Sequence, residues 1–263
     1  MPKVLLLTRY DRLGASSRVR FLQFLPDLER AGFDFDVQPL LDNAYVRSLY
    51  GGPPVGAVAI VRSYLRRLAA LLRRRRYDLV WLEKEALPWV PAWLEAPLLA
   101  GTPYVVDLDD AWFHRYEAHA SPVVRALLGG KIDAVMRRAA IVVAGNDVLA
   151  QRAREAGARR IEIMPSTVDL ARYAEPPAAP ARERNRTLVV GWIGIPLNAH
   201  YLTLVEPALR RAARDGSIKL HVVGAPVPSE FAGVPAEEFD WTESTEIERI
   251  RSEERRVGKE CRL

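Results

Sequence analysis

Short apolar runs alternate with longer helical patterns along most of this chain of 263 residues, and that alternation restricts its fold more than any other feature. The runs are rich in valine, isoleucine and leucine, which is typical of strands buried on both faces of a parallel sheet. Right-handed crossovers through the intervening helices then produce a doubly wound α/β fold. The predicted strands are Val4–Thr8, Phe33–Gln38, 78–83, 104–110, 140–146 and 160–165.

The alternation stops at residues 174–186, which are rich in proline, alanine and charge, and then restarts. Strands are predicted at 187–194 and 218–225 around a helix at 198–216, with a weaker strand at 237–241. We therefore expect two Rossmann-like domains: a complete one over 1–173, a linker over 174–186, and a partial one over 187–250.

The last stretch, "RSEERRVGKECRL" (251–263), fits neither a helical nor a strand period and contributes little apolar surface. A doubly wound domain of only about 65 residues is too small to bury its sheet. We therefore expect the second domain to be truncated at its C-terminal side and the tail to be foreign to the fold, with a natural charged tail as the alternative. A chain truncated in this way is expected to be weakly active or inactive.

Several classes of protein are not expected. No apolar run reaches the roughly 18 residues of a membrane span, and the N-terminal apolar run is too short for a secretory signal. The single cysteine, Cys261, excludes an internal disulfide framework and a cysteine-based zinc site. A cytoplasmic location is the simplest expectation.

The net charge of +5 is concentrated in "RSYLRRLAALLRRRRYD" (62–78). On a helix, one apolar stripe would contain Ile60, Val61, Tyr64, Leu65, Leu68, Ala69 and Leu72. One interpretation is an ordinary surface helix that buries this stripe and leaves the arginines in water. The other is attraction of Arg62–Arg76 to a polyanionic acceptor or to an anionic membrane surface, the latter of which would place the protein peripherally at the inner membrane face. No nucleic-acid partner is expected, because no aromatic and basic recognition pattern accompanies the arginines.

The loops that carry chemistry all follow predicted strands, so they should meet at the carboxyl edge of the sheet. In "DRLGASSRVR" (11–20), Gly14 would let backbone approach a ligand, Ser16 or Ser17 would cap a helix, and Arg18 would add positive charge. That pattern suits a phosphate or sugar hydroxyls, although an ordinary capped turn is the alternative. "GWIGIP" (191–196) repeats the arrangement with Gly194.

Carboxylates gather in "DLDDAWF" (107–113), where Asp107, Asp109 and Asp110 follow a strand. They would bind a divalent metal, bind or deprotonate a sugar hydroxyl, or cap the next helix. In "EKEALP" (83–88), Lys84 is either a substrate-binding residue or part of a solvated ion-pair cluster. Asn146 is expected mainly to cap a helix, and the histidines have no metal-ligand spacing.

Taken together, four segments resemble the group 1, or family 4, glycosyltransferases of the GT-B fold. The segments are "TRYDRLGASSRVR", "DLDDAWF", "AGNDVLAQRAREAGARRIEIMPSTVDLARY" and "VVGWIGIPLNAHYL". The resemblance implies a retaining transfer from a nucleotide-sugar donor to a glycan or lipid-linked acceptor, without a bound metal or another cofactor. It places the acceptor on the first domain and most of the donor on the second.

The resemblance also assigns roles to residues. Gly14, Ser16, Arg18, Lys84, Asn146, Gly194 and His200 would bind the donor or substrate, and Asp109 and Asp110 would be catalytic. This chain departs from the family where many relatives have a histidine in place of the aspartates. It also lacks the Arg and Lys that usually follow the second glycine loop, and the glutamate motif that holds the donor ribose and sugar.

Three other functions remain open at this point. One is a non-catalytic nucleotide-binding module. Another is a metal-dependent transferase that uses Asp107 and Asp109. The third is a dinucleotide-dependent oxidoreductase or epimerase, against which the absence of a G-x-G-x-x-G motif argues.

Overall fold

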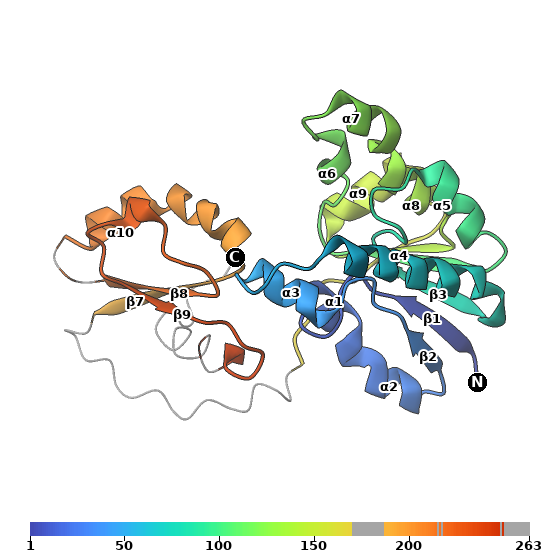
Figure 1. The fold of residues 1–263 in the computed structure, drawn as a ribbon, viewed down its shortest axis with the longest axis horizontal. Helices are drawn as coiled ribbons and strands as arrows, with labels where there is room; N and C mark the ends of the chain where they lie inside the picture. Colours follow the sequence, from blue (N-terminus) through green and yellow to red (C-terminus); the bar gives the residue numbers. More distant parts are fainter. Residues whose placement is uncertain (170–186, 215, 217, 248, 250–263) are drawn as a thin grey trace. The chain divides into compact units, whose positions relative to one another are not determined.

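The computed structural model describes residues 1–169, 187–214, 216, 218–247 and 249 (Figure 1). The chain divides into two compact units, the first formed by Met1–Val46 with Pro54–Val168, and the second by Arg47–Pro53 with Asp169–Leu263. The linker predicted at 174–186 and the foreign tail predicted at 251–263 lie outside the described residues.

The first unit contains a six-stranded parallel sheet with the strand order β2-β1-β3-β4-β5-β6. Its strands are β1 (Lys3–Leu7), β2 (Asp34–Val37), β3 (Leu79–Glu83), β4 (Tyr104–Leu108), β5 (Ile141–Ala144) and β6 (Ile161–Ile163). All six were predicted from the apolar runs. The chain reverses its direction of strand addition between β1 and β3, so the topological switch point lies at their carboxyl ends.

Successive side chains along each strand point to opposite faces of the sheet, and both faces are covered by other parts of the first unit. Leu5 on β1 and Val80 on β3 are fully buried in one core with Leu71 from a covering helix. On the opposite face, the ring of Trp81 packs edge-on against Phe21 at 5.0 Å and lies 6.4 Å from Phe35. Burial on both faces explains why these strands read as continuous apolar runs.

Most helices over residues 1–168 form where the sequence predicts them, with breaks at the expected residues, but the short helices Asn43–Leu49 and His114–Glu117 were not predicted. Pro26 lies in the first turn of a new helix, so the pattern over 17–31 is divided into three pieces. Gly129 and Gly130 separate the two halves of the pattern over 121–139. The helices are α1 (Ala15–Arg20), η1 (Leu22–Phe24), α2 (Leu25–Arg30), α3 (Asn43–Leu49), α4 (Ala57–Leu72), η2 (Arg74–Arg76), α5 (Ala92–Leu99), α6 (His114–Glu117), α7 (Pro122–Leu128), α8 (Lys131–Arg138) and α9 (Asp147–Glu155).

The orientation of α4 differs from the ordinary-surface-helix interpretation. Its buried face consists of Ser63, Arg67, Ala70 and Leu71, whereas Val61, Leu65 and Leu72 are exposed. The prediction of one buried apolar stripe is therefore wrong for Val61, Leu65 and Leu72, whereas Tyr64 of the same stripe packs on the core. The physical reason is Arg67, whose guanidinium donates hydrogen bonds to the carbonyl oxygens of Thr8 and Gln38 and so turns that side of the helix inward.

The second unit has a three-stranded parallel sheet with the order β7-β8-β9, formed by Leu188–Ile193, Ile218–Val223 and Ala236–Phe239. Leu220 and Val222 of β8 are fully buried in its core. The single helix predicted at 198–216 is instead a 3-10 segment, η4 (Pro196–Leu204), followed by α10 (Glu206–Ala212), because Pro207 starts a new helix. A short 3-10 turn, η5 (Ser229–Phe231), precedes β9.

Candidate functional site

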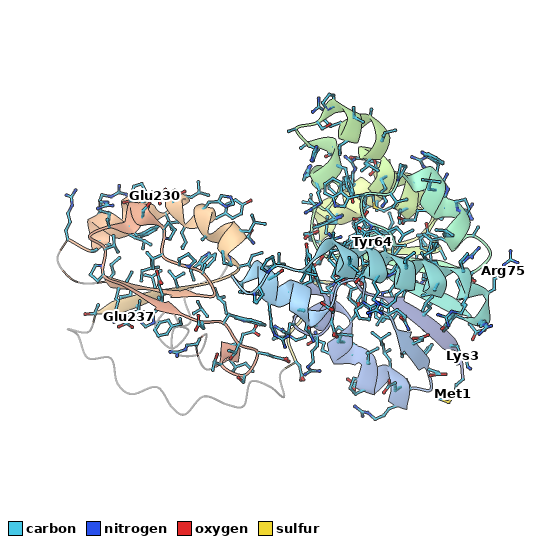
Figure 2. The ribbon with its side chains drawn as sticks, viewed as in Figure 1. Met1, Lys3, Tyr64, Arg75, Glu230 and Glu237 are labelled. Atoms are coloured by element: carbon cyan, nitrogen blue, oxygen red, sulfur yellow. The ribbon has the colours of Figure 1, made fainter. Side chains whose placement is uncertain are left out.

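The loops that follow β1, β3, β4 and β5 meet at the carboxyl edge of the six-stranded sheet. The backbone N–H of Lys84 donates to the carbonyl oxygen of Asp107 at 3.0 Å, and that of Gly145 donates to Leu108 at 2.8 Å. Tyr64 of α4, labelled in Figure 2, donates its hydroxyl to the carbonyl oxygen of Pro88 in the loop after β3. This edge contains the switch point at which doubly wound sheets bind ligands.

At the switch point, the Glu83 carboxylate binds the start of α1. Oε1 of Glu83 accepts a hydrogen bond from the Ser16 hydroxyl at 2.8 Å, and Oε2 accepts one from the Ser17 hydroxyl at 2.6 Å. Oε2 also accepts the backbone N–H of Arg9 at 2.7 Å. The prediction that Ser16 or Ser17 caps α1 is wrong, because Gly14 occupies the N-cap position and no side chain caps that helix.

Gly14 has a steric role in this loop. A Cβ atom at this position would lie 2.2 Å from Cβ of Tyr10, whereas the backbone φ of −72° suits any residue. The close approach that requires glycine is therefore an approach to Tyr10. The Arg18 side chain on α1 is buried at this end of the sheet, which leaves 4% of it exposed.

Lys84 forms an ion-pair cluster with the two aspartates predicted to be catalytic. Its ammonium nitrogen lies 2.9 Å from Oδ1 of Asp109 and 3.1 Å from Oδ2 of Asp110. Burial lowers the pKa of Lys84, but the two carboxylates outweigh this effect and leave that pKa above its ordinary value. The Lys84 backbone has a φ of +63°, a conformation that costs a non-glycine residue on the order of 1 kcal/mol or more. Asp110 is the most solvent-accessible residue of this cluster, with 53% of its side chain exposed.

Glu85, whose side chain is fully buried, is the centre of a second network. Its carboxylate accepts hydrogen bonds from Nε1 of Trp112 at 2.7 Å and from the hydroxyl of Tyr116 at 2.9 Å, and it pairs with Lys131 at 2.7 Å. Lys131 also pairs with Glu95 at 3.0 Å. The interpretation of residues 83–85 as a solvated cluster is therefore wrong, because all three side chains are buried.

Cations surround the indole of Trp112 beside this cluster. The guanidinium carbon of Arg9 lies 4.1 Å from the ring centroid, that of Arg115 lies at 4.8 Å, and the ammonium of Lys84 lies at 4.9 Å. Such contacts stabilise positive charge by about 0.5–2 kcal/mol each. The result is an aromatic side chain held next to Lys84 and Asp110 in a positively charged environment.

Asp107, the third carboxylate of the motif, is held by an arginine. Oδ1 of Asp107 accepts hydrogen bonds from Nε and Nη2 of Arg20 at 2.9 and 2.8 Å, while Nη1 of Arg20 donates to the carbonyl oxygen of Met164 at 2.5 Å. Burial raises the pKa of Asp107 to about 7 against the opposing charge of Arg20. Among the described residues, no group of three or more His, Cys, Asp or Glu side chains is placed to hold a metal ion.

The remaining predicted residues are Asn146, Gly194 and His200. Asn146 caps α9, as expected, by accepting the backbone N–H of Leu149 at 2.9 Å. Gly194 follows β7 in the second unit, and its N–H donates to Val223 at 3.0 Å. His200 is exposed on η4, with Nδ1 2.8 Å from the carbonyl oxygen of Leu197.

Several residues of this edge were missed in the sequence. Arg9, Tyr116 and Lys131 carry no motif, and they reach Glu85 from three different elements. One sequence signal did indicate that such partners exist: "EKE" (83–85) follows a fully apolar run without an intervening polar residue. Charged side chains placed that close to a buried strand are expected to need partners inside the protein.

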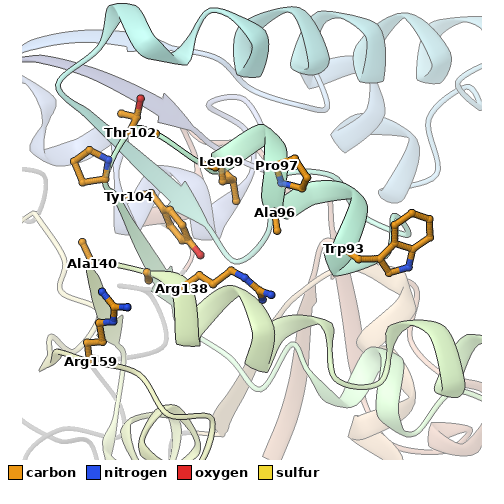
Figure 3. A pocket seen from close by; sticks show the side chains of 13 residues that line it. Trp93, Ala96, Pro97, Leu99, Thr102, Tyr104, Arg138, Ala140 and Arg159 are labelled. Carbon is orange, nitrogen blue, oxygen red and sulfur yellow. The ribbon is translucent and has the colours of Figure 1, made fainter.

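A surface pocket of about 700 Å³ lies at the opposite, amino edge of the same sheet (Figure 3). It is lined by residues that precede β4 and β5, among them Thr102 and Ala140, and by Trp93, Arg138 and Arg159. Because ligands of doubly wound folds bind at the carboxyl edge, this pocket is not the candidate site.

Solved structures with the same fold bind nucleotides or nucleotide sugars. The chain is similar to Anabaena HepE in a complex with UDP-glucose, with 15% identity, a TM-score of 0.61, and coverage of 92% of this chain and 70% of that one. It is similar to S. aureus MnaA in a structure with UDP, with 12% identity, a TM-score of 0.56, and coverage of 96% and 72%. At these identities the likeness concerns the fold, and the predicted class of two Rossmann-like units of GT-B type is confirmed.

Two further comparisons bear on identity. A search of curated proteins by sequence found no match. The model of the family described as "Glycosyl transferase 4-like domain" matches residues 5–167, which include the whole carboxyl edge of the six-stranded sheet. Because this match spans more than half of the chain, the protein belongs to the glycosyl transferase 4-like domain family.

Proposed function

We propose that this glycosyltransferase moves a sugar from a nucleotide-sugar donor to an acceptor hydroxyl at the carboxyl edge of the six-stranded sheet. Membership of the family supports the transfer reaction. The fold shared with HepE, whose structure contains UDP-glucose, and with MnaA, whose structure contains UDP, supports the class of donor.

The observation that carries this proposal is the cluster of Lys84, Asp109 and Asp110. The buried ammonium of Lys84 fixes both carboxylates, while Asp110 presents its carboxylate to solvent beside Trp112. A carboxylate accepts hydrogen bonds from sugar hydroxyls, and an indole face packs against the apolar side of a sugar ring. We assign Asp110 to the acceptor hydroxyl and Asp109 to the orientation of Lys84.

The donor diphosphate is assigned to positively polarised groups. Developing charge on a leaving diphosphate is stabilised by backbone N–H groups and by basic side chains held in fixed positions. We propose the loop that contains Gly14, together with Ser16 and Arg18, for this role in the first unit. Gly194 and His200 are the candidates in the second unit, and Asn146 is a further donor-side candidate. In this proposal the reaction retains the anomeric configuration and uses no metal or other cofactor.

The acceptor is proposed to be a glycan or a lipid-linked precursor, used by a cytoplasmic protein at the inner face of the membrane. The family match and the arginines of Arg62–Arg76 support this choice. Within the residues that the structure describes, no helix has the length and apolar character needed to cross a bilayer.

Calorimetric titration of the full chain with UDP-glucose, UDP and glucose tests the recognition of the donor class. The proposal predicts saturable binding of UDP-glucose and UDP without chelator sensitivity, and much weaker binding of glucose, because most donor contacts are made to the diphosphate. Binding of UDP-glucose that disappears with chelator would favour the metal-dependent alternative. If a panel of nucleotide sugars showed no binding at all, the nucleotide-sugar donor would be contradicted.

The stereochemical part of the proposal has its own test. Proton NMR of the product formed from an α-linked donor should show an α linkage if the transfer retains configuration. A β-linked product would contradict retention without affecting the assignment to the family.

A further inference from the structure

Helix α4 (Ala57–Leu72) directs apolar side chains into solvent. The exposed fractions are 84% for Val58, 57% for Val61, 61% for Leu65 and 63% for Leu72. At about 100° per residue, these four positions fall within an arc of about 60° on the helix surface. They therefore form one continuous apolar stripe, which we call the α4 stripe.

The outward orientation of the α4 stripe is fixed by contacts on the opposite side of the helix. The Arg67 guanidinium donates to the carbonyl oxygens of Thr8 and Gln38, and the Tyr64 hydroxyl donates to Pro88 at 3.0 Å. Burial lowers the pKa of Arg67 to about 9, which reflects the cost of holding a charged side chain inside. Amphipathic helices usually bury their apolar residues and expose their arginines, whereas α4 buries Arg67 and exposes the α4 stripe. An exposed apolar stripe of this kind indicates a binding surface.

Positive charge lies along one border of the α4 stripe. Arg62, Arg66 and Arg73 occupy an adjacent arc of the helix, and all three are exposed. The exposed Arg75, labelled in Figure 2, and Arg76 continue the basic region beyond the C-terminal end of α4. Residues 57–76 contain no aspartate or glutamate, so nothing on this helix neutralises the arginines.

We propose that the α4 stripe and its bordering arginines form a docking surface for a membrane that contains anionic lipids. Valine and leucine side chains enter the boundary between headgroups and acyl chains, while the guanidinium groups bind lipid phosphates and carboxylates. A second copy of the chain fits this surface less well, because two α4 helices face to face would bring their uncompensated arginines together. This inference deepens the membrane location given under the proposed function. Its failure would leave the transfer reaction untouched, since none of the docking residues belongs to the candidate site.

Co-sedimentation of the full chain with lipid vesicles tests this inference. Vesicles of phosphatidylcholine mixed with phosphatidylserine should bind the protein, and vesicles of phosphatidylcholine alone should bind it at least tenfold more weakly. Added salt should weaken binding to the anionic vesicles, because exposed charges are screened.

Two double variants separate the apolar and charged contributions. The double variant Val61→Ser/Leu65→Ser should bind anionic vesicles at least tenfold more weakly than the wild type, because less apolar area enters the lipid. The double variant Arg62→Gln/Arg66→Gln should bind anionic vesicles more weakly, by about fivefold for each arginine that is removed. The matched controls, Val148→Ser for exposed apolar area and Arg154→Gln with Arg211→Gln for charge, should bind like the wild type.

Three results would overturn the inference. One is binding of the apolar double variant to anionic vesicles at wild-type strength. Another is equal binding of the wild type to neutral and anionic vesicles. The third is an absence of vesicle binding together with a dimer, seen by analytical ultracentrifugation, that the apolar double variant converts to a monomer. Circular dichroism checks that each variant is folded, which is expected because every substituted side chain is exposed.

Discussion

The ammonium nitrogen of Lys84 lies 2.9 Å from Oδ1 of Asp109, and the lysine side chain is only 4% exposed. A charge this deeply buried is stable only with a partner, so the carboxylates and the lysine stabilise each other's position. The positive φ of Lys84 shows that the loop after β3 accepts a backbone cost to bring this side chain to the aspartates. The relationship connects the end of β3 to the loop after β4, where the candidate site is formed.

Replacing Lys84→Met tests the relationship directly. The variant keeps the length of the side chain but leaves Asp109 and Asp110 without their cation. We expect the free energy of unfolding to fall by about 1–3 kcal/mol, less than for a fully enclosed pair because Asp110 is half exposed. Urea denaturation measures this change. Lys84→Arg keeps the charge and should recover part of the loss; equal stabilities of Lys84→Met and the wild type would contradict the account.

Lys131 should be the more sensitive lysine. It lies between Glu85 and Glu95, at 2.7 and 3.0 Å, and its side chain has no exposed surface. Lys131→Met leaves the buried Glu95 without a cation and Glu85 with only Arg9, at 3.4 Å, and we expect a loss of about 3–5 kcal/mol in the free energy of unfolding. Lys219→Met, which removes a surface pair with Glu237, should cost much less in the same urea experiment, because water screens that pair. Similar losses for the two variants would argue against the buried network.

Gly14 provides a steric prediction. A Cβ atom there would overlap Tyr10, so Gly14→Ala should destabilise the protein by about 1–3 kcal/mol as the loop after β1 shifts. Gly56→Ala is the matched control, since it also precedes a helix and a Cβ atom there meets nothing within 4 Å. Thermal unfolding should show a lower Tm for the first variant and little change for the second. If both variants kept the wild-type Tm, the contact with Tyr10 would have no energetic role.

The pH dependence of stability should report on Asp107. Because burial raises the pKa of Asp107 to about 7, the folded chain binds this proton more tightly than the unfolded chain, whose Asp pKa is about 3.9. The free energy of unfolding should therefore decrease as pH rises from about 4 to about 7, by at most about 1.4 kcal/mol for each pH unit from this group.

Urea unfolding at a series of pH values measures that slope. Asp107→Asn keeps an oxygen that accepts from Arg20 and resembles the protonated carboxyl, so its stability is expected to be close to that of the wild type near pH 4, with a flatter slope between pH 4 and 7. Asp133→Asn, which removes a partner of Arg152 at the surface, should keep the wild-type slope. An unchanged slope in Asp107→Asn would remove this carboxylate as its source.

The sequence was sufficient to predict the architecture. Most strands are short apolar runs, although β2 and β9 each contain two acidic residues, and Pro26, Gly129 and Gly130 mark helix boundaries. These signals are readable because they depend on local backbone and burial requirements. The helix predicted over 198–216 was wrong because proline at 207 divides it into two elements. The capping role of Asn146 was also predictable, since it depends on residues within one turn.

The contacts of the site were not predictable in the same way, because they join residues far apart in the chain. Glu83 accepts hydrogen bonds from Ser16 and Ser17, which lie 67 and 66 positions earlier in the chain. Lys131 reaches Glu85, in the loop after β3, from helix α8. The orientation of α4 is a similar case. Periodicity identifies which residues share a face, but the carbonyl groups that receive Arg67 decide which face is buried.

The most direct test of the proposed reaction is transfer of labelled sugar from a bound nucleotide sugar by the wild-type chain and by Asp110→Asn. If Asp110 engages the acceptor hydroxyl, the variant should transfer at least about 100-fold more slowly while its affinity for the nucleotide sugar, measured by calorimetry, stays the same. Glu162→Gln, an exposed acidic residue on β6, is the control and should transfer at the wild-type rate. Equal transfer rates for Asp110→Asn and the wild type would contradict the assignment of the reaction to this cluster.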